Sequence, residues 1–323
     1  MRPAHLRDTK AMTTLRSLFR LQVLLMALFC ASQPVPAHTG NSRGKILVDG
    51  QKRSYLLHVP KSYAHEQKQV PLVLVFHGAF GSSHITRWDS RMSEQAEKDG
   101  FIVAYPNALF GTWNAGNCCG ISKIKIINDV GFVSQLIDQL QKKYRIDPKR
   151  IYVAGVSNGG MLAYKLGREL SDRIAAIAPI EGCMYPDDKD VRNPVSVIAF
   201  HGTRDPVIPY GGGTGSWLGI KLKVPSVAET IEFWTKHDGC ETSPEKERAN
   251  DITRELFKNG KDNAEVCLYT LTGGGHIWPG GRRALLTGHN SERDLSATET
   301  MCNFFWAHPK TTARNLDETT RQN

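Results

Sequence analysis

The 323-residue sequence lacks features that would point to several classes of protein. It has no C-x-x-C pair and no histidine cluster beside its cysteines, so we expect no metal site of the zinc type. Lys and Arg are scattered rather than gathered in a run with interleaved aromatic residues. We therefore expect no nucleic-acid partner despite the formal net charge of +9. There is no internal repeat and no evident second-domain boundary.

The first 37 residues contain an apolar run that is too short to span a bilayer. Arg16 and Arg20 precede the run L-Q-V-L-L-M-A-L-F-C-A, and V-P-A follows, with a cleavage position after Ala37. This pattern predicts a signal peptide over residues 1–37 that is removed, with no stable membrane insertion afterwards. A membrane anchor or a buried helix is the alternative. We expect a secreted protein, extracellular or periplasmic.

A serine stands at the turn between a predicted strand and a predicted helix. Residues 151–156 are an apolar, β-branched run, and after Gly155-Val156-Ser157-Asn158-Gly159 the apolar residues recur at helical spacing. Glycines on both sides let strand and helix approach closely and leave the Ser157 hydroxyl exposed. A G-x-S-x-G turn in this setting is typical of the nucleophile of α/β-hydrolases.

Two further polar residues follow predicted strands. Asp205 comes after residues 195–200, and His276 comes after residues 267–271. The order serine, acid, histidine is that of α/β-hydrolases, and parallel strands bring such loops to one edge of a sheet. Because a serine hydroxyl is a weak nucleophile, we expect His276 to accept its proton and Asp205 to orient the imidazole.

The predicted strand 70–76 ends in H-G-A-F-G, where α/β-hydrolases place a backbone donor of the oxyanion hole. We expect the amide of Asn158 and that of Ala79 or Phe80 to face the oxyanion. His77 is a candidate for substrate binding from the same loop, and His201 is expected to support the loop of Asp205.

Three tryptophans in glycine-rich surroundings are candidates for substrate binding: Trp113, Trp217 and Trp278. Trp113 lies in a long loop over residues 111–120, where it is either a substrate platform or a cover over the core.

The remaining patterns predict one α/β domain over residues 38–308, with a mostly parallel central sheet and helices on both faces. Alternating apolar residues around Asp49-Gly50 predict a hairpin over 45–59, and helical periodicity covers 85–98. A capping box at Ser226 opens a helix that Gly239 ends. Residues 309–323 are a polar tail that we expect to be disordered.

Six cysteines would remain after cleavage of the predicted signal, an even count typical of disulfides in exported proteins. We expect Cys240 to pair with Cys267, because the helix and strand that carry them follow one another. We expect Cys119 to pair with Cys183, because both lie in loops near strand ends.

Taken together, several motifs resemble the poly(3-hydroxybutyrate) depolymerase-like family of α/β-hydrolases, which includes feruloyl and acetylxylan esterases. They are H-G-A-F-G-S, D-V-G-F-V-S-Q-L-I-D-Q-L, R-I-Y-V-A-G-V-S-N-G-G-M-L-A-Y, H-G-T-R-D-P-V-I-P-Y and G-G-G-H-I-W-P-G, and the likeness covers residues 44–308. The resemblance implies an exported serine esterase without a cofactor, with Ser157, Asp205 and His276 as its triad. Two departures stand out: Ala79 replaces a cysteine found in many members, and no linker or polymer-binding module follows the domain.

The sequence thus predicts an exported serine esterase that acts on small or polymeric esters. Hydroxybutyrate oligomers or polyester, and feruloyl or acetyl esters of plant polysaccharide, all remain open as substrates, and the oligomeric state is not predicted. Three alternatives share the same residues: a serine peptidase of the same fold, an inactive carbohydrate-binding relative that uses its tryptophans, and an acyltransferase.

Overall fold

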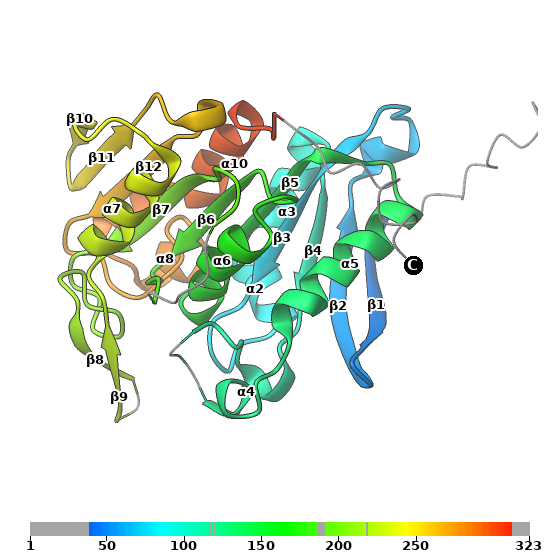
Figure 1. Ribbon diagram of the computed structural model, residues 1–323, viewed down its shortest axis with the longest axis horizontal. Helices are drawn as coiled ribbons and strands as arrows, with labels where there is room; N and C mark the ends of the chain where they lie inside the picture. The colour runs from blue at the N-terminus through cyan, green and yellow to red at the C-terminus, as the bar shows by residue number, and fades with distance from the viewer. Residues whose placement is uncertain (1–38, 117, 119, 186–190, 218, 312–323) are drawn as a thin grey trace, which may run out of the picture. The chain divides into compact units, whose positions relative to one another are not determined.

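A ten-stranded mixed sheet forms the centre of the protein, with the strand order β1-β2-β4-β3-β5-β6-β7-β12-β11-β10 (Figure 1). The computed structural model describes residues 39–116, 118, 120–185, 191–217 and 219–311. The strands are β1 Gly40–Val48, β2 Gln51–Val59, β3 Val70–Phe76, β4 Ile102–Pro106, β5 Ile146–Val156, β6 Ala176–Ile180, β7 Ser196–Gly202, β8 Gly213–Trp217, β9 Ile220–Val224, β10 Glu245–Ala249, β11 Ile252–Phe257 and β12 Val266–Leu271. The central strands, in the sheet order β4-β3-β5-β6-β7-β12, are parallel, as predicted. The outer strands, β1 and β2 on one side and β11 and β10 on the other, pair antiparallel.

Helices cover both faces of this sheet, which confirms the predicted α/β architecture. Tyr152 of β5 stacks on Phe305 with ring centroids 4.7 Å apart, so α10 covers that face. Ile177 of β6 points to the other face, where it contacts Gly167 of α6. The helices are α2 Ser83–Ser90, α3 Met92–Asp99, α4 Gly120–Ile124, α5 Asp129–Lys143, α6 Asn158–Glu169, α7 Val227–Asp238, α8 Arg282–Thr287, α9 Asn290–Asp294 and α10 Ala297–Ala307.

The amino-terminal hairpin agrees with its predicted turn. Val48 of β1 faces Gln51 of β2, so Asp49 and Gly50 alone make the connection. Both have positive φ, 48° and 73°, which is the backbone twist that a two-residue hairpin turn requires. The capping box at Ser226 and the end of α7 at Gly239 are also as predicted.

The helix expected over 85–98 is instead two helices that meet at Arg91, whose φ is 56°. The break lets each helix pack against a different neighbour. Asp89 at the end of α2 binds Arg283 of α8, whereas Met92 and Ala96 of α3 enter the core that α10 completes. Tertiary packing therefore overrides the continuous helical pattern.

Two strands that the sequence analysis missed overturn one predicted disulfide. β10 and β11 form an antiparallel hairpin at the end of the sheet, between α7 and β12, so Cys240 and Cys267 do not lie on consecutive elements. Both are free thiols, and Cys240 Sγ faces the carbonyl of Ala264 at 3.6 Å. Cys267 instead enters the apolar core from β12.

The second predicted disulfide is also wrong, because Cys183 is a free thiol. Burial raises the pKa of this thiol to about 12. Its predicted partner Cys119 lies outside the described residues, as does the predicted signal peptide over 1–37.

The predicted tail lies largely outside the described residues. Residues 309–311 belong to the described part, and Lys310 donates from its ammonium group to the carbonyls of Ser171 and Ile174. Among the helices that the structure describes, none has the length and hydrophobicity needed to cross a membrane.

We predict that Gly155→Ala destabilises the fold. A Cβ at this position would lie 2.3 Å from the carbonyl oxygen of Gly159, so strand and helix would have to separate. We expect the free energy of unfolding in urea to fall by about 2 kcal/mol or more. Gly211→Ala is the matched control, because a Cβ there would meet nothing within 4 Å. Equal urea midpoints for Gly155→Ala and the wild type would contradict this account of the turn.

Candidate active site

Ser157 occupies the turn between β5 and α6 in a backbone conformation that is uncommon for a residue with a side chain. Its φ is 58° and its ψ is −123°. Its N–H donates to the carbonyl of Ile180 at the end of β6, at 2.8 Å, which ties the turn to the neighbouring strand. Strained backbone of this kind persists only where the surroundings enforce it, and it directs the hydroxyl away from the sheet.

Asp205 and His276 are hydrogen-bonded, with Nδ1 of the ring 2.7 Å from Oδ2 of the carboxylate. Oδ1 of Asp205 accepts the N–H groups of Val207 and Ile208 at 2.7 and 2.9 Å. Burial works to raise the pKa of Asp205, but the hydrogen bonds from His276, Glu181 and the backbone outweigh it and lower that pKa. Asp205 is therefore a carboxylate that orients the imidazole.

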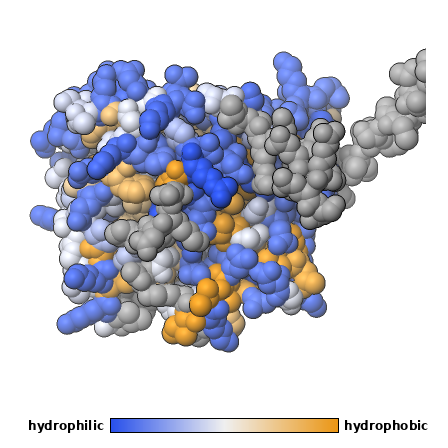
Figure 2. Space-filling view, viewed as in Figure 1, coloured by the Kyte–Doolittle hydropathy of each residue, from blue (hydrophilic) through white to orange (hydrophobic). Residues whose placement is uncertain are grey.

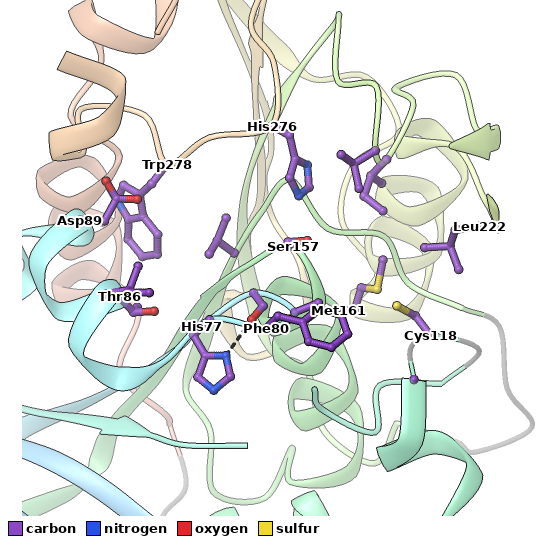
Figure 3. Close-up of a pocket in the computed structure, with 18 of the residues that line it drawn as sticks. His77, Phe80, Thr86, Asp89, Cys118, Ser157, Met161, Leu222, His276 and Trp278 are labelled. Atoms are coloured by element: carbon purple, nitrogen blue, oxygen red, sulfur yellow. Dashed lines mark hydrogen bonds between the residues drawn. The ribbon is translucent and has the colours of Figure 1, made fainter. Parts of the chain in front are cut away.

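His276 and Ser157 line the same cavity (Figure 3). In this view the ring of His276 points toward Ser157. Among the described residues no hydrogen bond joins the two side chains. The structure thus brings Asp205 into contact with His276 and turns the ring toward the serine. Such hydrogen bonds are often long in the absence of substrate.

The loop after β3 packs directly against the serine. A Cβ added to Gly78 would lie 3.2 Å from Cβ of Ser157. The N–H of Phe80 donates to the carbonyl of Gly111 at 2.6 Å, so the candidate oxyanion donor Phe80 is already engaged. This corrects the prediction for Phe80 and leaves Ala79 as the candidate of this loop, with Asn158 at the first turn of α6.

His77 shapes this loop through both of its ring nitrogens. Its Nε2 accepts the N–H of Ala108 at 3.1 Å, so its proton lies on Nδ1, which donates to the carbonyl of Gly78 at 2.7 Å. Burial lowers the pKa of His77. Both ring nitrogens are therefore engaged within the protein, while His77 also lines the cavity that contains Ser157, so its substrate-binding role stays a prediction.

Neither Trp113 nor Trp278 is part of an exposed platform. Trp113 is fully buried, and its indole N–H donates to the carbonyl of His77 at 2.9 Å, so it covers the core and supports the loop. Trp278 forms part of the cavity wall but is 1% exposed, and its N–H donates to Thr298. Trp217 lies at the end of β8, and its side chain is outside the described part of the chain.

The cavity that contains the serine has a volume of about 600 Å³. Its walls are largely apolar and come from distant parts of the chain; among the lining residues are Phe80, Ile85, Met161, Ile208 and Leu222. Two of its apolar lining residues are also strongly exposed: Phe80 is 59% and Ile124 of α4 is 79% exposed. Figure 2 shows hydrophobic surface on the same side of the molecule as α4.

Glu181, a fully buried carboxyl group beside Asp205, is not among the residues predicted from the sequence. Glu181, His201 and Asp205 present ligand-type atoms within 4.8 Å of one another. The nitrogen of His201 that faces the two carboxyl groups donates to the carbonyl of Ile208 at 2.8 Å, so it offers no lone pair to a metal ion. His201 thereby supports the loop of Asp205, as expected. Glu181 follows directly after β6, which is the signal that could have identified it.

Comparison with known proteins finds similarity to carboxylic ester hydrolases. The family described as phospholipase/carboxylesterase matches residues 60–216. The chain is 31% identical to feruloyl esterase B of Piromyces equi, over 69% of this chain and 42% of that protein. It is 25% identical to poly(3-hydroxyalkanoate) depolymerase C of Paucimonas lemoignei, over 69% of this chain and 58% of that one. The aligned part of the chain therefore spans 42% of the length of the first relative and 58% of the length of the second.

The solved structures confirm the fold. The acetyl xylan esterase of Aspergillus awamori superposes with a TM-score of 0.55 at 17% identity, covering 80% of this chain and 99% of that one. The α/β sheet, the serine turn and the family match agree. The chain is a carboxylic ester hydrolase with the α/β-hydrolase fold, and its residues 60–216 are similar to the phospholipase/carboxylesterase family.

Proposed function

We propose that the protein is an exported serine esterase in which Ser157, His276 and Asp205 act as a catalytic triad. The observation that carries this proposal is the 2.7 Å hydrogen bond from His276 to the buried Asp205, at a cavity that also holds the strained serine. With Nδ1 bound to the carboxylate, Nε2 of His276 is the nitrogen left to take the serine proton.

The reaction then proceeds through an acyl-enzyme. Ser157 Oγ attacks the ester carbonyl as its proton passes to His276, and the amides of Ala79 and Asn158 bind the oxyanion. His276 gives the proton to the departing alcohol. Water, deprotonated by His276, attacks the acyl-serine and releases the acid with regeneration of the hydroxyl.

Among the open acyl groups, we propose an apolar, aromatic acid of the hydroxycinnamate type. The cavity walls support it, because apolar side chains such as Met161 and Leu222 surround the serine. The similarity to a feruloyl esterase of Piromyces equi points the same way. A short hydroxybutyrate oligomer is the second candidate, favoured by the likeness to the depolymerase of Paucimonas lemoignei.

Ser157→Ala removes the nucleophile, so we predict a fall in kcat for 4-nitrophenyl esters on the order of 10⁴-fold or more. Ser216→Ala, at an exposed position of β8, is the matched serine control and should keep wild-type rates. Comparable hydrolysis by Ser157→Ala and the control would refute the triad.

We predict that Leu222→Ala lowers kcat/KM for methyl ferulate about tenfold while changing the value for a 4-nitrophenyl acetate substrate little, because only the larger acyl group reaches this wall of the cavity. Lys221→Ala is the control, since successive residues of β9 point to opposite sides and Lys221 is exposed. If kcat/KM falls by the same factor for both substrates, the cavity wall at Leu222 does not select the acyl group.

Export is proposed on the arginines, apolar run and V-P-A cleavage pattern of residues 1–37. We predict that protein expressed from the full sequence with its own first 37 residues is recovered outside the cytoplasm, starting at His38. Intact-mass measurement of the exported protein checks this, and an uncleaved chain held in the cytoplasm would contradict it.

A further inference from the structure

The carboxyl group of Glu181 lies beneath the acid of the proposed triad, fully out of contact with solvent. It accepts the N–H of Gly202, at the end of β7, at 3.0 Å from one oxygen and 3.2 Å from the other. A carboxyl oxygen of Glu181 and one of Asp205 lie within 4.8 Å of each other. Two buried carboxyl groups this close together do not both ionise, so one of them holds a proton that the other can accept.

The local backbone points this side chain inward. Glu181 has a φ of 46°, which is uncommon for a residue with a Cβ, and its N–H donates to the carbonyl of Phe200 on β7 at 2.9 Å. The next residue, Gly182, lies against the first turn of α6, where a Cβ would be 2.9 Å from the carbonyl carbon of Gly160. Glu181 is therefore held between the serine helix and the strand that leads to Asp205.

The charges around Glu181 decide which carboxyl group keeps the proton. The anionic groups that face it are Asp205 and, at longer range, Glu292, whose two oxygens accept the N–H groups of Gly275 and His289. His201 lies beside it but is neutral, since burial lowers its pKa and its N–H is bound to Ile208. Burial and these neighbouring carboxylates raise the pKa of Glu181 well above its usual range.

Asp205 has the opposite surroundings. Its oxygens accept hydrogen bonds from two backbone N–H groups and from Nδ1 of His276. All three bonds favour the ionised form of Asp205. The proton therefore belongs to Glu181, whose hydroxyl donates to Asp205.

We propose that Glu181 is a positioning residue: it remains a neutral carboxylic acid whose O–H donates to Asp205 and so holds that carboxylate in the direction of His276. This inference rests on the proposed function, because it gives Glu181 a role in the same triad. Nothing in it requires Glu181 to contact substrate.

Two substitutions separate a neutral donor from an anion. Glu181→Gln keeps the shape and the neutral charge, and its amide can donate to Asp205 while its carbonyl accepts the N–H of Gly202. Glu181→Leu keeps a similar volume but removes the donor. Asp238→Leu is the matched control, because Asp238 is a fully buried carboxyl group at the opposite end of β7, where it binds Nδ1 of His237 at 2.7 Å and accepts the N–H of Val195 at 3.4 Å.

The first readout is the pH profile of kcat/KM with a 4-nitrophenyl ester. We expect the kcat/KM of Glu181→Gln to stay within about threefold of the wild-type value, with the acidic limb of its pH profile at the wild-type pH. We expect Glu181→Leu to lose about tenfold or more in kcat. Asp238→Leu should keep the wild-type profile. A Gln variant whose acid limb moves to lower pH would show that a negative charge near His276 was lost, and would overturn the proposal. Equal losses in the Gln and Leu variants would overturn it too.

The second readout is stability and does not need activity. The carboxyl group of Glu181 has a pKa above the ordinary value of 4.5 in the folded protein, so above pH 4.5 the unfolded chain releases a proton that the folded protein keeps. This contribution lowers the stability of the wild type as pH rises, and it is absent from Glu181→Gln. We therefore expect the urea midpoint of Glu181→Gln to rise relative to that of the wild type as the pH is raised from 4.5 to 7. A difference that is constant or shrinks over this range would overturn the neutral state of Glu181.

Failure of the proposed function and failure of the positioning role give different results. If Ser157→Ala remains active, the proposed function fails, and the positioning role of Glu181 fails with it, whatever the stability readout gives. If Ser157→Ala is inactive but the Glu181 variants behave otherwise than stated, only the role of Glu181 fails.

Discussion

The close contact between the first turn of α6 and the strands beneath it is the constraint on which the rest of the site depends. A Cβ at Gly159 would lie 2.5 Å from the carbonyl oxygen of Phe76 and 2.6 Å from that of His77. The helix that starts beside Ser157 therefore packs against the end of β3 and the first residue of the loop that carries Ala79, the proposed second oxyanion donor. This packing contact holds the proposed nucleophile close to the proposed donors.

The second organising feature is a pair of buried carboxyl groups at the same edge of the sheet. Asp205 is surrounded by hydrogen-bond donors, which lower its pKa despite burial, whereas the pKa of Glu181 is raised by burial and by the charge of its neighbour. Adjacent carboxyl groups in an apolar interior cannot both be ionised. The difference between their environments leaves one as an acceptor for His276 and the other as a donor to that acceptor.

The sequence predicts the parts of this fold that carry strong periodic signals. Apolar runs identify the parallel strands because these strands are buried on both faces, and β3 begins at Val70 and ends at Phe76 as expected. β10 was not predicted, because all five of its residues are exposed and are either charged or small. It therefore has no apolar face that would indicate a strand. That omission also produced the wrong pairing of Cys240 with Cys267.

Site residues can be predicted where they directly follow a predicted strand. They cannot be predicted where their role depends on how tertiary packing buries them. Asp205 and His276 follow their strands, and the structure brings them together. The burial of Trp113 depends on packing against Phe76, with ring centroids 5.2 Å apart, and on a hydrogen bond to a distant loop, neither of which has a local pattern. Glu181 had a strand-end signal, but only the tertiary structure places its carboxyl group against Asp205.

The central claim is that one serine hydroxyl becomes a nucleophile through His276, and chemical labelling tests it most directly. Folded protein is treated with a fluorophosphonate that reacts only with activated serines, digested, and the modified residue is located by mass spectrometry. The account predicts a single stoichiometric adduct on Ser157, with the rate of labelling strongly reduced in His276→Ala. An active ester hydrolase that carries no adduct on Ser157, or labelling that is unaffected by loss of His276, would contradict it.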